Sequence, residues 1–275
     1  MRDHLAFRLA YRGTAFKGFQ FQKNVVTIQA KVEEAFARYF KESRRVHFGS
    51  RTDAGVHAYD HFVYFPKAFE LYTALGVSKR KSFLSSLNFM LGNDIRIWEF
   101  GRLSSNFNVM EDIVSKSYSY FILSSPVEDP ILTEYFHWIR HSLNLRAMRK
   151  AQRQILGTHN FACFAKSSGV SVRNSERGTT RRIYKASIVS RLHPQMKIGQ
   201  ILEFKFEGSG FLRHMVRNMV GTLVQVGEGK GTNIKSILRS GSRLEAGPNL
   251  PANSLFLTGT KIRAGLYAPL RPQTE

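Results

Sequence analysis

The sequence is poor in cysteine, in long apolar runs and in acidic residues, and each shortage excludes a class of protein. One cysteine, Cys163, stands among 275 residues, which excludes an internal disulfide and favours a reducing compartment. No apolar run approaches the roughly 20 residues that span a bilayer. The first residues, MRDHLAFRLAYRG, lack the apolar core of a signal peptide. We therefore expect a cytoplasmic protein without a membrane segment.

Acidic residues number 20 against 41 Lys and Arg, which gives a formal net charge of +21. Such an excess predicts a polyanionic partner, and nucleic acid is favoured over an acidic membrane surface. The segment from Arg140 to Lys185 holds 11 Lys or Arg and a single acid, Glu176. Within it, SSGVSVRNSERGTTRR (167–182) predicts a flexible basic loop that contacts phosphates. The alternative is an ordinary solvated surface.

Apolar periodicity predicts a repeated order of elements. The first half has strands at 5–11, 46–50, 61–66 and 95–97, a helix that follows the capping residue Thr27, and a helix at 83–91. This β-α-β-β-α-β order is ferredoxin-like, an arrangement that binds RNA in other proteins. The second half repeats it with strands at 118–122, 181–192, 200–210 and 255–264, and helices after Asn144, at 211–226 and at 233–240.

We therefore predict an α+β fold of two ferredoxin/RRM-like halves, residues 1–104 and 105–275. The halves are expected to form an extended mixed, mostly antiparallel sheet that is flanked by helices. The first half carries the loop around Asp53, and the second carries Tyr118 on a strand and Arg217 on a helix. A cleft between the two halves is the expected place for an active site.

The helix predicted at 211–226 has one apolar arc. The opposite arc carries Arg213, His214, Arg217 and Asn218, and glycines flank it. We interpret this arc as a cationic stripe that a ligand approaches closely. A plain solvated face is the alternative.

Other motifs are incomplete. GEGKGT (227–232) imitates a phosphate loop, but Val224 and Gly231 occupy positions where that loop needs glycine and Ser or Thr. His57 and His61 lack a Cys or Glu that would complete a metal shell, so we expect no metal. A metal-dependent nuclease is disfavoured because no carboxylate cluster is present.

The stretch HFGSRTDAGVHAYDHFVYF (47–65) places an aspartate between two predicted strands. Asp53 lies in a loop with Gly49 and Gly55, where the backbone can approach a ligand closely. The alternative is an Asx-turn, in which Asp53 only caps its own backbone.

This loop closely resembles the GRTDAGVH signature of the tRNA pseudouridine synthase A family. Six further segments resemble the family in the same order along the chain. They are YRGTAFKGFQFQ (11–22), LNFMLGNDIRI (87–97), KSYSYFIL (116–123), GTHNFACF (157–164), FLRHMVRNMVGTLVQVGEGK (211–230) and LPANSLFL (250–257). The resemblance covers most of the chain.

The resemblance implies that Asp53 is the catalytic nucleophile, that Tyr118 stacks on the target base, and that Arg217 pairs with the aspartate. It implies conversion of uridine to pseudouridine at tRNA positions 38–40, in the anticodon stem-loop, by a homodimer without cofactor or metal. We expect the RNA to be contacted by Tyr118, Arg51, His57, Arg213 and His214. A non-catalytic RNA-binding protein on the same scaffold is the alternative function.

The chain also departs from the family pattern. Phe21 stands where the pattern has arginine, and Met110, Glu111 and Asp112 replace part of a basic segment. These changes affect the expected docking of RNA. The sequence leaves open whether the aspartate attacks C1′ or C6 of the uridine.

Overall fold

The computed structural model describes residues 2–166, 178–193 and 198–270. The chain divides into two compact units, Met1–Val114 with Leu257–Glu275, and Ser115–Phe256. The predicted division at residues 104 and 105 follows the order of elements, whereas these units follow contacts. The last strands, which that division assigns to the second half, are therefore counted here with the first unit.

The first unit contains five strands and four helices within the residues described, and two further strands cross its boundary. Its own elements are β1 (His4–Tyr11), α1 (Ile28–Phe40), β2 (His47–Phe48), β3 (His57–Phe65), α2 (Phe69–Thr73), α3 (Val77–Lys81), α4 (Phe83–Met90), β4 (Ile95–Leu103) and β11 (Tyr267–Leu270). β5 (Ile113–Ser124) begins in this unit, and β10 (Leu255–Ile262) ends in it.

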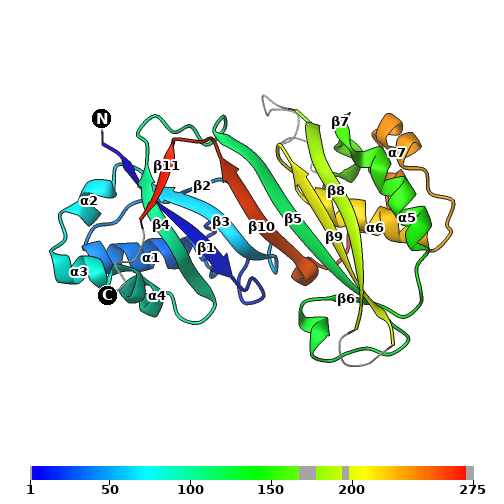
Figure 1. The fold of residues 1–275 in the computed structure, drawn as a ribbon, viewed down its shortest axis with the longest axis horizontal. Coiled ribbons are helices and arrows are strands. Elements are labelled where there is room, and N and C mark those ends of the chain that lie inside the picture. The colour runs from blue at the N-terminus through cyan, green and yellow to red at the C-terminus, as the bar shows by residue number, and fades with distance from the viewer. Residues whose placement is uncertain (1, 167–177, 194–197, 271–275) are drawn as a thin grey trace. The chain divides into compact units, whose positions relative to one another are not determined.

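The predicted ferredoxin-like order is confirmed in this unit. β1 lies between β3 and β4 and is antiparallel to both, and β2 pairs with β3 (Figure 1). Two later strands extend the sheet, which runs β11-β4-β1-β3-β10. β11 is antiparallel to β4, with Tyr267 opposite Leu103.

The two faces of this sheet have separate apolar cores. Aromatic rings of the strands and of α1 and α4 fill one core, with ring centroids 3.8–6.2 Å apart: Phe7, Phe36, Phe65, Phe83 and Phe100. The other core contains Ala6, Phe62, Tyr64, Leu103, Phe107 and Ile113. Because successive strand residues point to opposite faces, neighbours such as Ala6 and Phe7 belong to different cores.

Helix α1 forms where the sequence predicts it. The Thr27 hydroxyl accepts a hydrogen bond from the Ala30 N–H at 3.3 Å, which caps the helix. Ile28, Val32 and Phe36 are buried at four-residue spacing and turn the apolar face toward the sheet.

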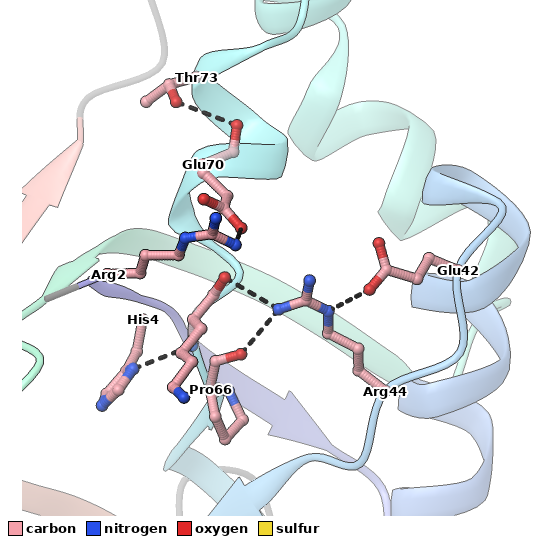
Figure 2. A network of polar contacts seen from close by, with 8 residues as sticks. Arg2, His4, Glu42, Arg44, Pro66, Glu70 and Thr73 are labelled. Atoms are coloured by element: carbon pink, nitrogen blue, oxygen red, sulfur yellow. Dashed lines mark hydrogen bonds and ion pairs between the residues drawn. The ribbon is translucent and has the colours of Figure 1, made fainter.

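A polar network ties the segment after α1 to the end of β3 (Figure 2). Arg44 donates from Nη1 to the carbonyls of Pro66 and Lys67, both at 2.9 Å. The Lys67 N–H donates to His4 Nδ1 at 3.0 Å. Because His4 is buried, its pKa is lowered below 6.5. Folding therefore favours the neutral form of the His4 imidazole.

The second unit repeats the element order as β5, α5 (Leu145–Gln152), β8 (Thr180–Leu192), β9 (Gln200–Gly208) and α6 (Met215–Gly227). Its shorter elements are β6 (His137–Ile139), β7 (Gly157–Asn160) and α7 (Ile234–Ser240). The strands run β5-β9-β8-β7 with antiparallel pairing, and β6 is parallel to β5.

Alternation along β9 marks the buried face of this sheet. Leu202, Phe204 and Phe206 are buried, while Glu203 and Lys205 between them are more accessible. α5 begins directly after Asn144, as predicted, and the side-chain oxygen of Asn144 caps it by accepting from the Ala147 N–H at 3.0 Å. The Gln152 amide donates to the Ala186 carbonyl at 2.6 Å and joins α5 to β8.

Candidate functional site

Asp53 lies in an irregular loop between β2 and β3, as the sequence predicts. The residue is half-buried, and the preceding Arg51 is exposed. The Asp53 carbonyl accepts from the Val56 N–H at 3.1 Å, which closes a tight turn. Gly55 in that turn has φ +81°, a left-handed conformation that glycine adopts without strain.

The segment between β1 and α1 packs directly on this loop. The Phe19 N–H donates to the Thr52 carbonyl at 3.1 Å. Gly18 has φ +94°, and a β-carbon there would lie 3.0 Å from the Thr52 carbonyl oxygen and 3.3 Å from the Ala54 nitrogen. A β-carbon at Gly13 would lie 2.0 Å from the Val56 carbonyl oxygen. The two glycines therefore let one backbone support the other at close range.

Buried side chains hold the residue before Asp53. The Tyr11 hydroxyl lies 2.8 Å from Thr52 Oγ1 and 2.9 Å from His61 Nδ1. Tyr11 is 5% exposed and His61 is fully buried. This tyrosine–threonine–histidine contact is absent from the sequence-based prediction, because it joins β1, the loop and β3 through residues that no local pattern connects.

His57, predicted to contact RNA, is buried. Its Nδ1 accepts from the Gly13 N–H at 3.1 Å, so the ring joins the start of β3 to the segment that follows β1. Its role toward RNA stays a prediction. Within the described residues, no three His, Cys, Asp or Glu side chains gather in a way that could hold a metal ion.

Two tyrosines of β5 occupy different surroundings. The Tyr118 ring is 8% exposed and meets the Phe211 ring edge-on, with centroids 5.1 Å apart. Tyr120 is fully buried, and its hydroxyl donates to the Pro251 carbonyl at 3.0 Å. Burial raises the pKa of the Tyr120 phenol far above its ordinary value, against a smaller opposing effect of the Arg217 charge. The Tyr120 hydroxyl is therefore held in a structural contact.

Helix α6 begins at Met215, four residues later than predicted. Arg213 and His214 precede it, and His214 has a left-handed backbone with φ 65°. Asn218 is 1% exposed, donates to the Phe164 carbonyl at 2.7 Å and accepts from Arg243 at 3.1 Å. The predicted cationic stripe is therefore wrong as a continuous helix face, because Arg217 alone among its four members is an accessible residue of the helix.

Arg217 is anchored at one edge of its guanidinium. Its Nε donates to the Leu250 carbonyl at 2.5 Å. Residues 247–250 pack along α6, where a β-carbon at Gly221 would lie 2.0 Å from the Pro248 carbonyl oxygen. The Gly247 N–H donates to the Thr222 hydroxyl at 2.7 Å. The orientation of Arg217 thus depends on a segment that lies far from it in the sequence.

The basic stretch 167–182 is partly outside the described residues, since 167–177 are not among them. Its last residues, Thr180–Arg182, form the start of β8, which confirms the strand predicted at 181–192 and shows that the predicted loop extends too far. Arg182 is exposed, and its guanidinium carbon lies 5.7 Å from the centroid of the Tyr184 ring. A cation over an exposed aromatic ring is suited to contact with RNA.

None of the helices that the structure describes is long and apolar enough to cross a membrane. A solved structure titled as the archaeal box H/ACA sRNP Nop10-Cbf5 complex is similar at 10% identity over 80% of this chain and 44% of that chain, with a TM-score of 0.31. That likeness is too low to support an inference.

Comparison of sequences identifies the family. Residues 151–261 match a family model described as tRNA pseudouridine synthase. The tRNA pseudouridine synthase A of Geobacillus kaustophilus is 34% identical over 94% of this chain and 93% of its own length. That of Thermosipho africanus is 36% identical over 92% of this chain and 96% of its own. With such identity over nearly its whole length, the chain belongs to the tRNA pseudouridine synthase A family, which is a family of isomerases.

Proposed function

We propose that this protein isomerises uridine to pseudouridine at positions 38–40 of tRNA, in the anticodon stem-loop, with Asp53 as the nucleophile. The observation that carries the proposal is the setting of Asp53. Its loop is held by close backbone contacts to Gly13, Gly18 and Phe19 and by the Tyr11 hydroxyl, which bonds the Thr52 side chain. A carboxylate that must reach one atom of a bound nucleotide requires such preorganisation.

The reaction breaks the N1–C1′ bond of uridine and forms a C5–C1′ bond. Asp53 adds covalently, at C1′ or at C6 of the ring, and so divides one difficult step into easier ones. After uracil has rotated and rejoined through C5, the proton on C5 leaves. The carboxylate is expelled at the end, so the reaction consumes no co-reactant and we propose no cofactor or metal.

Arg217 and Tyr118 complete the proposed site. A nearby guanidinium keeps a carboxylate ionised in a dry pocket. Because Arg217 Nε already donates to Leu250, we propose that Asp53 is paired end-on, through the two Nη atoms. Tyr118 stacks on the uracil that has left the helix and takes the C5 proton through its hydroxyl.

We propose that RNA docking uses Arg51 and His57 beside Asp53, and Arg213 and His214 beside Arg217. The exposed Arg51 and the net charge of +21 support binding to the phosphate backbone. We further propose, on the family resemblance, that the enzyme acts as a homodimer in the cytoplasm.

The test measures release of tritium from tRNA that carries C5-tritiated uridine. Wild-type protein is expected to release label and to form pseudouridine at positions 38–40. Asp53→Asn keeps the shape of the side chain and removes the nucleophile, so release is expected to stop while tRNA binding stays intact or tightens. Turnover above a few per cent of wild type, with deamidation excluded, would rule out Asp53 as nucleophile. Tight binding by the wild type without release would identify a non-catalytic RNA-binding protein.

A further inference from the structure

The segment between β1 and α1 presents an aromatic ring at the surface. Phe21 is 46% exposed, and the Arg45 guanidinium carbon lies 5.0 Å from the centroid of its ring. Arg45 itself is 65% exposed. The two side chains form an accessible pair of a flat π-surface and a flat cation, which we name the Phe21–Arg45 stack.

A chain of three hydrogen bonds links the Phe21 backbone to the Arg45 guanidinium and holds this stack. The Phe21 N–H donates to Gln29 Oε1 at 2.8 Å, and Gln29 Nε2 donates to Glu33 Oε1 at 2.8 Å. Arg45 Nη1 donates to Glu33 Oε2 at 3.1 Å. Gln29 is 6% exposed and the Glu33 side chain 16% exposed. Two largely buried polar side chains therefore fix both members of an exposed pair.

The stack lies on the same segment that supports Asp53. Phe19, two residues before Phe21, donates its N–H to the Thr52 carbonyl, and Thr52 directly precedes Asp53. Two residues of extended chain span at most about 7 Å. An RNA that presents a nucleotide to Asp53 would therefore bring the neighbouring nucleotides within reach of the stack.

We propose that the Phe21–Arg45 stack is a platform for one unpaired nucleobase of the RNA, next to the uridine that is isomerised. The proposal rests on the proposed function of the site. An exposed aromatic face binds any base by stacking, and the adjoining guanidinium adds a cation–π contribution and a charge for phosphate. Because one exposed apolar residue is ordinary in itself, the fixed guanidinium and its buried supports carry the argument.

The experiment measures binding of a synthetic hairpin with the sequence of a tRNA anticodon stem and loop. Phe21→Leu keeps an apolar side chain and removes the π-face, and its affinity is expected to fall about 5- to 150-fold. Phe21→Tyr keeps the π-face and is expected to bind like wild type. Phe89→Leu, at an 86% exposed phenylalanine of α4, is the matched control and should change nothing. The slope of log affinity against log salt should be unchanged in Phe21→Leu, because stacking releases no counterions.

A double-mutant cycle identifies the base. Each unpaired nucleotide of the hairpin is made abasic in turn and bound to wild type and to Phe21→Leu. At one position, removal of the base is expected to weaken binding by wild type but not binding by Phe21→Leu, because both changes remove the same contact. Equal binding by Phe21→Leu and wild type would overturn the proposed role of the stack. Strict additivity of the two free-energy changes at every position would do so as well.

The binding measurements separate this proposal from the proposed function. Coupling at one base without tritium release by wild type would support the stack and reject the enzymatic activity. Normal tritium release with no coupling at any base would support the enzymatic activity and reject the stack as a platform. A large loss of thermal stability in both Phe21→Leu and Phe21→Tyr would show that the ring serves the fold, which also overturns the platform.

Discussion

The residues proposed for catalysis sit in two contrasting kinds of structure. Asp53 lies in an irregular loop, and its position is set by contacts from β1, β3 and the segment that follows β1. Tyr118 and Arg217 lie in β5 and α6, where regular backbone hydrogen bonds set the position of the backbone, and the Arg217 side chain is further anchored at the Leu250 carbonyl. The backbone at Asp53 is therefore held by a few individual contacts, whereas the backbone at Tyr118 and Arg217 is held by the repeated hydrogen bonds of a sheet and a helix.

The contrast determines where substitutions should act. The many repeated hydrogen bonds of a strand or helix make its backbone tolerant of single changes nearby, so Tyr118 and Arg217 should respond chiefly to changes of their own side chains and, for Arg217, of the segment that carries Leu250. The Asp53 loop has few supports, and a change in any of them should move the carboxylate. We therefore expect substitutions at a distance to affect Asp53 more than Tyr118 or Arg217.

The largest effect that tests this contrast is expected for Tyr118→Phe. The stacking ring is kept and the hydroxyl lost, so product formation should fall about 10²–10⁴-fold while RNA affinity holds. Tritium release and equilibrium binding on the same preparation measure the two quantities. Near-normal release would leave Tyr118 with stacking alone.

Tyr120→Phe is the control on the same strand. It removes the hydrogen bond from the fully buried Tyr120 to the Pro251 carbonyl, so the free energy of unfolding should drop about 0.5–1.5 kcal/mol with turnover nearly unchanged. A loss of turnover like that of Tyr118→Phe would mean that β5 does not separate the two roles.

Arg217→Lys should fail nearly as badly as Arg217→Ala, although lysine keeps the charge. Lysine has no Nε to donate to Leu250 and no planar fork for a carboxylate. Loss of the charge-assisted hydrogen bonds that we propose between Arg217 and Asp53 should cost about 1.5–3 kcal/mol, so the rate should fall roughly 10- to 150-fold. Single-turnover kinetics measure the effect, with Arg239→Lys on α7 as the conservative control. Substantial rescue by lysine would reduce the requirement to charge alone.

A smaller effect is expected for Tyr11→Phe, which removes the hydroxyl between Thr52 and His61. The loop should loosen, and kcat should fall on the order of 10-fold with KM unchanged. Tyr39→Phe removes a hydroxyl bonded to the Lys79 carbonyl near α3 and should leave kcat unaffected. A drop in stability without any change in kcat would show that Tyr11 supports the fold and not the loop.

The smallest predicted effect is on the pH dependence of the free energy of unfolding, and it involves two histidines that are not proposed for catalysis. Burial lowers the pKa of His4 below the unfolded value of 6.5, and the pKa of His137 is lowered in the same way. Below pH 6.5 the folded state then binds fewer protons than the unfolded state. The free energy of unfolding should therefore be highest above pH 6.5 and fall as the pH drops below it. Urea unfolding at pH 5.5 and 7.5 checks this. His4→Asn keeps an acceptor for the Lys67 N–H and should weaken the dependence; an unchanged dependence would assign it to other groups.

Sequence patterns predict correctly those helices and strands that are determined by residues close together in the chain. Thr27 and Asn144 cap the helices they were expected to cap, and the alternation along β9 marks its buried face. The loop of Asp53 is predicted because strands flank it. Its motif also carries the family resemblance, on which the roles proposed for Tyr118 and Arg217 rest.

Contacts between distant residues escape such patterns. The sequence around His214 looks helical, but the left-handed backbone at that residue delays α6 until Met215. Asn218 looks polar and exposed, yet its amide fills the hydrogen-bonding needs of Phe164 and Arg243. The contacts of the Tyr11 hydroxyl with Thr52 and of the Leu250 carbonyl with Arg217 cannot be predicted from neighbouring residues, because each joins two distant segments of the chain.

The return of the chain to its first unit affects the order in which the protein folds during synthesis. β11 pairs with β4, and β10 stands beside β3 in the sheet, although both strands leave the ribosome after the whole of residues 115–256. Until then β4 presents an open edge, and the outer edge of β3 is covered only by the two-residue strand β2, and open edges invite pairing with other chains. The second unit is continuous in sequence and can fold meanwhile. A nascent chain stalled before residue 257 is thus the form most exposed to aggregation, and the one for which chaperones would matter most.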